Sequence, residues 1–186
     1  MSITSLTPLS YVVLALVGDG GAGAHDLVLA MRQGGPVYWG GAPSGLYSEP
    51  KRLARLGYLT ARLEPGRTHP RTVYTLTDAG RNALRGWLTE PAHFPRVKNE
   101  AHLRLLAGDL LGDAAIVKSF RGMLPELDRL QALAQEMYDQ ADQLPHRARY
   151  LRLSHAYALR LVQLHREWIT DIQRELTSAD PDQADG

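Results

Sequence analysis

The stretch GLYSEPKRLARLGYLTAR, residues 45–62, decides the fold of this chain. Its first part predicts a helix with three leucines on one face and three basic residues, Lys51, Arg52 and Arg55, on the other. Gly57 is a typical helix end, and the alternating residues that follow it predict a strand. The elements predicted on either side of this stretch indicate what a basic helix joined to a basic strand by a single glycine is for.

Two more helices are expected upstream of this stretch. Thr7 and Pro8 are typical of an N-cap and a first helical residue, and a second short helix is expected over 25–33. The third helix is predicted from Ser44 to Leu56. Because Pro50 is unfavourable inside a helix, we expect this helix to begin a few residues after Ser44.

A β-hairpin and a fourth helix are expected downstream. Residues 58–63 and 72–76 alternate and are rich in strand-forming residues, with prolines and a glycine between them. The next helix is capped by Thr77 and stops at Pro91. Three helices, a hairpin and a helix follow the order of a winged helix-turn-helix, in which the third helix is the recognition helix. The fold class is therefore mainly α with a small β-hairpin.

Positive charge is concentrated in the third helix and the hairpin. The whole chain has a formal net charge of +1, but residues 44–71 hold six Lys or Arg against two Asp or Glu. A local positive field of this kind suits a nucleic acid, whereas a solvated protein face is the alternative interpretation. The candidate DNA-binding residues are Ser44, Tyr47, Ser48, Lys51, Arg52 and Arg55 on the helix, and Arg67, His69 and Arg71 on the hairpin.

The first 90 residues resemble the PadR family of bacterial transcriptional regulators. The resemblance rests on LTPLSYVVLALV, SGLYSEPKRLARLGYLTAR and VYTLTDAGRNALRGWL, in this order and at this spacing. The segment GGAGAHDL departs from the family's usual pattern after the first helix. The resemblance implies a cytoplasmic, homodimeric regulator, expected to be a repressor, that binds pseudo-palindromic operator DNA. The alternative is a winged-helix protein–protein interaction module without specific DNA binding.

The second half, residues 91–176, is predicted to be a helical, coiled-coil-like dimerisation domain. One helix is expected over 99–111, and a last helix over 147–176 has an apolar stripe at Tyr157, Leu161, Leu164, Trp168 and Ile172. Between these two helices the apolar residues follow a heptad pattern, at Phe120, Met123, Leu127, Leu130, Ala134, Met137, Ala141 and Leu144. Pro125 is expected to bend or divide the helix that carries this pattern. Residues 177–186 are expected to be a disordered acidic tail.

Four aromatic residues are candidates for an effector pocket. Trp39, Trp87, Trp168 and Tyr157 have the side chains to hold a small aromatic effector, and the family resemblance implies such ligands. Ordinary packing in the core or at an interface is the alternative interpretation of the same residues.

Other function classes are disfavoured by the sequence. GDGGAG, residues 18–23, matches a dinucleotide-binding pattern, but no acidic residue lies about 20 residues later. The chain has no cysteine, and its histidines show no metal-binding spacing, so neither a metal nor a cofactor is expected. No serine lies in a nucleophile motif, which argues against an enzyme. The sequence shows neither a signal peptide nor a membrane span, so a cytoplasmic location is expected.

Overall fold

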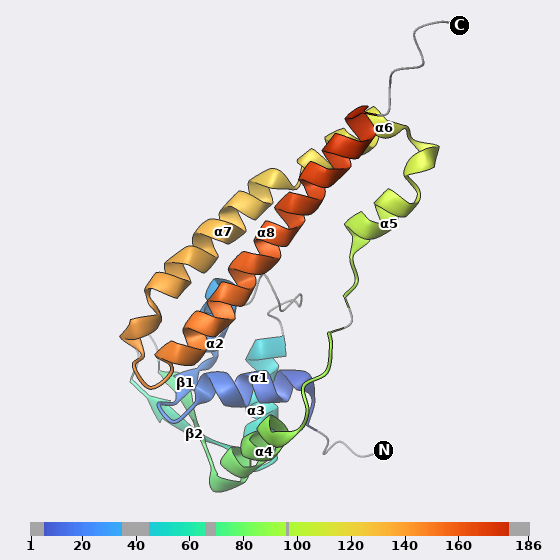
Figure 1. The fold of residues 1–186 in the computed structure, drawn as a ribbon. Helices are drawn as coiled ribbons and strands as arrows, with labels where there is room; N and C mark the ends of the chain where they lie inside the picture. Colours follow the sequence, from blue (N-terminus) through green and yellow to red (C-terminus); the bar gives the residue numbers. More distant parts are fainter. Residues whose placement is uncertain (1–5, 35–44, 66–69, 96, 179–186) are drawn as a thin grey trace, which may run out of the picture. The chain divides into compact units, whose positions relative to one another are not determined.

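The computed structural model describes residues 6–34, 45–65, 70–95 and 97–178 (Figure 1). The chain divides into two compact units, Met1–Phe94 and Pro95–Gly186. The first unit holds four helices and a small sheet among its described residues, and the second is helical. The winged-helix fold expected for the first unit is confirmed.

Three of the four helices described in the first unit begin within one residue of where the sequence predicts. The first helix, α1 (Pro8–Val17), has a capping box between Thr7 and Ser10 and a proline in its first turn. It is followed by α2 (Ala24–Gly34), α3 (Gly45–Arg55) and α4 (Asp78–Thr89). The Thr77 hydroxyl caps α4 by accepting a hydrogen bond from the Gly80 amide. Their apolar faces share one core, whose buried members are Val13, Leu14, Val17, Leu27, Val28, Leu46, Leu53, Leu59, Tyr74 and Leu76.

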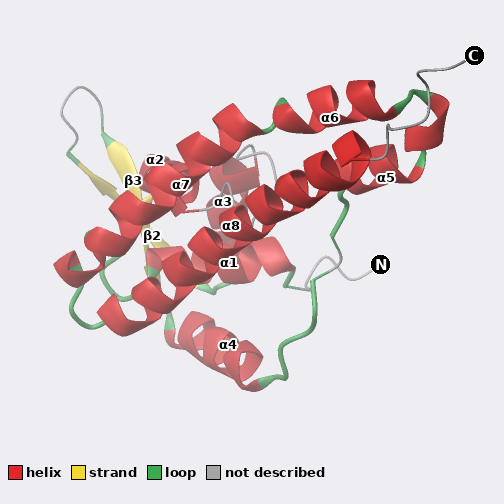
Figure 2. Cartoon of the chain, turned by 45° about the horizontal axis from the view of Figure 1, so that its top comes forward, coloured by secondary structure: helices red, strands yellow, loops and turns green. Residues whose placement is uncertain are grey.

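The hairpin is part of a three-stranded antiparallel sheet, drawn in yellow in Figure 2. The strands β2 (Leu59–Glu64) and β3 (Arg71–Leu76) pair from Leu59 opposite Leu76 to Glu64 opposite Arg71. A third strand, β1 (Ala22–Gly23), pairs with the other edge of β3. Sequence patterning missed β1, because two residues are too few to show alternation. The glycine-rich segment 18–23 therefore follows a helix, α1, and its last two residues form a strand. A dinucleotide-binding fingerprint instead requires a strand before the glycines, so this segment does not fit that motif.

The expected late start of the third helix was wrong. α3 begins at Gly45, and Pro50 lies inside it. A proline there removes one amide donor and crowds the carbonyl four residues before it. The ring of Pro50 is fully buried, so apolar packing offsets part of that cost.

The second unit contains four α-helices in its described part. These are α5 (Glu100–Leu106), α6 (Asp113–Arg121), α7 (Leu124–Asp139) and α8 (Ala148–Ser178). The single helix expected over 99–111 is broken, because a short 3-10 turn, η1 (Gly108–Leu110), follows α5. The expected division near Pro125 occurs, since α6 ends at Arg121 and Pro125 stands in the first turn of α7. A second 3-10 turn, η2 (Ala141–Gln143), follows α7, and α8 includes the first two residues of the expected tail.

Four heptad residues, Phe120, Leu127, Ala134 and Ala141, are buried within the second unit, whereas Leu144 at the end of the pattern is exposed. Phe120 and Leu127 pack with Val162, Ile169 and Ile172 in one cluster, to which α6 also contributes. The pattern correctly indicated a helix–helix seam, but the covering helix comes from the same chain. None of the helices in the described part has the length and hydrophobicity that a membrane span needs.

Candidate nucleic-acid interface

One face of α3 is exposed and basic. Tyr47 is 50% exposed, and Ser48, Lys51 and Arg55 are exposed beside it. Residues 47, 51 and 55 are one helical turn apart and form a single stripe, while Leu46 and Leu53 on the opposite face are buried. Among the described residues, the side chains of Lys51 and Arg55 have neither an ion-pair partner nor a hydrogen-bond partner. Their charges are therefore available to a polyanion.

Arg52 does not belong to this exposed stripe. Its Nε donates to Oε2 of Glu49 at 2.8 Å, and one Nη donates to Oε1 of Glu49 at 2.7 Å and to Oγ of Ser10 at 2.9 Å. The Ser10 hydroxyl in turn donates to Oε1 of Glu49 at 2.6 Å. Because Ser10 lies on α1, these bonds join α1 to α3. We call Thr7, Ser10, Glu49 and Arg52 the α1–α3 cluster.

The α1–α3 cluster is largely buried. Ser10 is inaccessible to solvent, and the side chains of Glu49 and Arg52 are 10% and 23% exposed. The Arg52 guanidinium lowers the pKa of Glu49 from its ordinary value of 4.5, because hydrogen bonds to the carboxylate outweigh its partial burial. The same pairing raises the pKa of Arg52. Both groups are charged at neutral pH and satisfy one another.

The lowered pKa of Glu49 predicts an acid-sensitive first unit. A carboxyl group whose pKa is lower in the folded state contributes stability above its unfolded pKa, here near 4.5. That contribution is lost as pH falls through the folded pKa. We expect hydrogen exchange of β2 and β3 amides, corrected for intrinsic rates, to report a loss of stability below about pH 4.5. Glu49→Gln should flatten this dependence; an unchanged profile would contradict the assignment.

The hairpin carries fewer available charges than the sequence suggests. Arg62 pairs with Glu64 at 2.6 Å, and Arg71 lies 3.4 Å from the Asp26 carboxylate and 4.0 Å from Glu64. Each of these pairs is exposed enough to exchange partners at low cost. The candidates Arg67 and His69 on the hairpin, and Ser44 before α3, lie outside the described residues.

The position of the hairpin relative to α3 is fixed at one junction. Gly57, with φ of +81°, turns the chain from α3 into β2. The Thr77 hydroxyl donates to the Gly57 carbonyl at 2.7 Å, and the Thr77 amide donates to the Tyr58 carbonyl at 3.2 Å. The start of α4 therefore holds the end of α3 and the start of β2 together, and this fixes the orientation of the hairpin relative to α3.

The four aromatic candidates do not form one site in the described structure. Trp87 stacks on Tyr11 in the first unit, with ring centroids 4.7 Å apart. Trp168 makes an edge contact with Phe120 in the second unit, at 5.1 Å. Tyr157 is 51% exposed on the same helix as Trp168, about 16 Å away along its axis. Trp39 lies outside the described residues.

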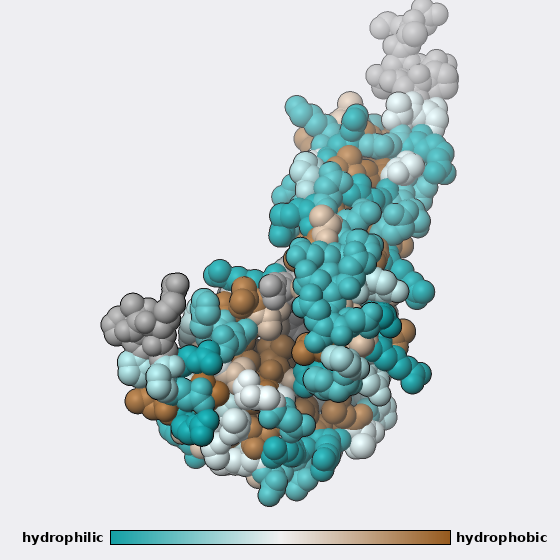
Figure 3. All heavy atoms as spheres, turned by 90° about the vertical axis from the view of Figure 1, so that its left-hand side faces the viewer, coloured by the Kyte–Doolittle hydropathy of each residue, from teal (hydrophilic) through white to brown (hydrophobic). Residues whose placement is uncertain are grey.

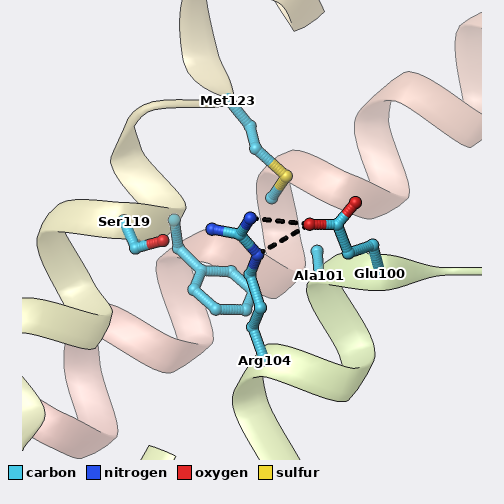
Figure 4. A pocket seen from close by; sticks show the side chains of 6 residues that line it. Glu100, Ala101, Arg104, Ser119 and Met123 are labelled. Carbon is cyan, nitrogen blue, oxygen red and sulfur yellow. Dashed lines mark hydrogen bonds and ion pairs between the residues drawn. The ribbon is translucent and has the colours of Figure 1, made fainter. Parts of the chain in front are cut away.

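Two cavities flank the contact between Phe120 and Trp168. One, of about 360 Å³, is lined by Asn99, His102, Leu164, His165, Glu167, Trp168 and Asp171. The other, of about 260 Å³, lies between α5 and α6 and is shown in Figure 4. There Arg104 reaches toward Met123 and donates two hydrogen bonds to one carboxylate oxygen of Glu100. Sequence reasoning missed Arg104, which no motif marks.

Comparisons with known proteins agree with the resemblance found in the N-terminal motifs. No family model matches the chain. The negative transcriptional regulator PadR of Bacillus subtilis is 31% identical over 98 residues, which are 52% of this chain and 54% of that protein. The chain thus matches about half the length of this relative, and the PadR resemblance is confirmed there.

Solved structures extend the likeness to the whole fold. Bacillus subtilis PadR in complex with operator DNA has a TM-score of 0.74 and 23% identity, covering 94% of this chain and 100% of that one. The same protein in complex with p-coumaric acid has a TM-score of 0.70 and 23% identity, covering 91% and 98%. The chain therefore has the PadR fold in both units.

Proposed function

We propose that this PadR-like chain is a DNA-binding transcriptional regulator that contacts DNA through α3 and the β2–β3 hairpin. The observation that carries the proposal is the exposed stripe of Tyr47, Lys51 and Arg55, whose charges have no partner among the described residues. A helix of this kind fits the major groove, with lysine and arginine suited to phosphates and guanine. The operator complex of PadR, which shares the fold, supports this use of the surface. Because the matched relative is a negative regulator, repression is the expected sign.

The regulator acts as a homodimer in this proposal. One winged helix supplies few phosphate contacts, and two copies related by a two-fold axis read half-sites about 34 Å apart. An exposed apolar stripe on α8 supports a second copy as the partner. Figure 3 shows one face of the molecule, on which apolar residues are scattered among hydrophilic ones. Its members share one helix face and are Tyr150, Leu153, Tyr157 and Leu164, which are 70%, 64%, 51% and 58% exposed.

Substitution in the α8 stripe should separate the two copies. Leu153→Asp with Leu164→Asp is expected to raise the dimer dissociation constant at least about 100-fold, because two-fold symmetry buries each new charge twice. Sedimentation equilibrium measures it. Thr170→Asp, on the same helix but off the stripe, is the matched control. A double variant that remains dimeric would exclude this stripe as the dimer interface.

A small aromatic effector is the second part of the proposal. The cavities beside Phe120 and Trp168 provide aromatic walls, and Arg104 provides a cation that a carboxylate could take over from Glu100. The p-coumaric acid complex of PadR supports an aromatic acid as the ligand class. Of the aromatic candidates from the sequence, Trp168 is the one whose surroundings favour this role.

The first experiment is fluorescence anisotropy of the full chain with DNA from upstream of its own gene, at two salt concentrations. Tight binding that survives random competitor DNA and weakens steeply with salt is expected. An aromatic carboxylic acid added to the complex tests effector release. Binding no better than to random DNA, repeated with oligonucleotides selected from a random pool, would favour the protein–protein interaction module.

A further inference from the structure

We propose that the α1–α3 cluster sets the sequence selectivity of α3, with Glu49 and Arg52 as positioning residues that do not touch DNA. This inference rests on the proposed function. It reverses the role that sequence patterning gives to Arg52, which lies next to Lys51 and shares its charge.

The cluster is a fixed joint between two helices. Arg52 holds both carboxylate oxygens of Glu49 through Nε and one Nη, at 2.8 and 2.7 Å, in the bidentate arrangement that fixes a guanidinium most rigidly. Ser10 Oγ accepts from the Thr7 amide at 2.8 Å and donates to Glu49, so the same hydroxyl belongs to the α1 cap. The middle of α3 is thereby tied to the first turn of α1.

This joint lies beside the surface proposed to meet DNA. Lys51 is adjacent to Arg52 in the chain, and Arg55 is one turn later. Hydrogen bonds to base edges need a helix placed to within a fraction of an ångström, whereas attraction to phosphates tolerates larger shifts. Loosening the joint should therefore weaken binding to the preferred sequence more than binding to random DNA.

Conservative variants distinguish positioning from direct contact. Arg52→Lys keeps the positive charge but loses the two-pronged bond to Glu49. If Arg52 contacted phosphate, the lysine would preserve most of the affinity. Glu49→Gln removes a negative charge near the DNA, which would strengthen binding if only net charge mattered. A positioning role predicts the opposite for both variants, namely weaker specific binding.

The test measures affinity for the best oligonucleotide selected by the wild-type chain and for random DNA, using full-length protein. We expect Glu49→Gln and Arg52→Lys each to reduce the ratio of the two affinities at least about fivefold, the lower range of one base contact. The double variant should lose no more than either single variant, because both break one joint. The salt dependence of binding to random DNA should stay unchanged.

The chain provides a matched control. Arg129 donates to Glu126 through Nε and an Nη at 2.9 and 2.6 Å, with the same spacing in sequence, but on the exposed surface of α7. Glu126→Gln should leave the ratio as it is in the wild type. The ratio does not depend on the folded fraction, so simple loss of stability cannot mimic the expected result. An unchanged ratio in both cluster variants would overturn this inference, whereas a wild-type ratio near one would overturn the proposed function.

Discussion

Gly80→Ala is expected to destabilise the first unit by at least about 2 kcal/mol, because a side chain there meets backbone that cannot move. A Cβ built on Gly80 would lie 2.1 Å from the Tyr58 carbonyl oxygen. That oxygen accepts the hydrogen bond from the Thr77 amide, so it is fixed at the junction of α3, β2 and α4. Relief of the clash would separate the helix from the hairpin.

Gly86→Ala provides the comparison on the same helix. Nothing lies within 4 Å of a Cβ at Gly86, which is exposed near the end of α4. Alanine there should stabilise the unit by about 0.5–1 kcal/mol through helix propensity alone. Thermal unfolding and hydrogen exchange of β2 and β3 amides report both changes. Equal effects of the two substitutions would show that the contact at Tyr58 is not rigid.

The same junction explains why the N-terminal motifs predict the fold so well. Thr77 and Gly80 belong to one short motif because one caps α4 and the other admits the Tyr58 carbonyl. The capping box at Thr7 and the helix-ending Gly57 likewise act through neighbours close in sequence. Interactions of this local kind leave a pattern that can be read without a structure.

The elements that sequence reasoning missed depend on distant partners. The strand β1 exists because Ala22 and Gly23 pair with Tyr74 and Val73, some fifty residues away. The heptads between Phe120 and Leu144 predicted a seam correctly, but their pattern is the same whether α8 or a second copy covers it. Similarly, α8 is helical as predicted, but Val162 and Ile169, which lie off the predicted apolar stripe, are buried, whereas Leu164 of that stripe is exposed.

In the candidate site, too, contacts between residues close in sequence were predictable, whereas contacts between distant residues were not. Glu49 and Arg52 are three residues apart on a helix, a spacing that allows an ion pair, so their pairing was predictable from the sequence. The third partner, Ser10, lies 39 residues before Glu49 and leaves no sequence signal. Without it, Arg52 looks like Lys51 and Arg55. A stripe of basic residues therefore contains two kinds of side chain that only tertiary structure separates.

Loss of Lys51 and Arg55 should have the largest effect on DNA binding. The double variant Lys51→Ala with Arg55→Ala is expected to weaken binding to any DNA at least about tenfold at moderate salt. It should also reduce the slope of log affinity against log salt by about one for each phosphate that the variant no longer binds. Both side chains are exposed on α3 and have no partner among the described residues, so their removal leaves the α1–α3 cluster and the core intact. Anisotropy titrations over a salt series measure both quantities.

A control with the same change in charge separates contact from long-range attraction. Lys118 and Arg121 are exposed on α6 in the second unit, and replacing both by alanine removes two positive charges there. If α3 contacts phosphates, this variant keeps nearly the wild-type salt slope, since exposed charges that do not contact the DNA release no counterions and are screened over about 10 Å at 0.1 M salt. Equal losses of affinity in both variants would mean that the net charge of the chain, and not the α3 stripe, attracts DNA. A steep slope that survives the α3 substitutions would move the phosphate contacts to other residues of the winged helix.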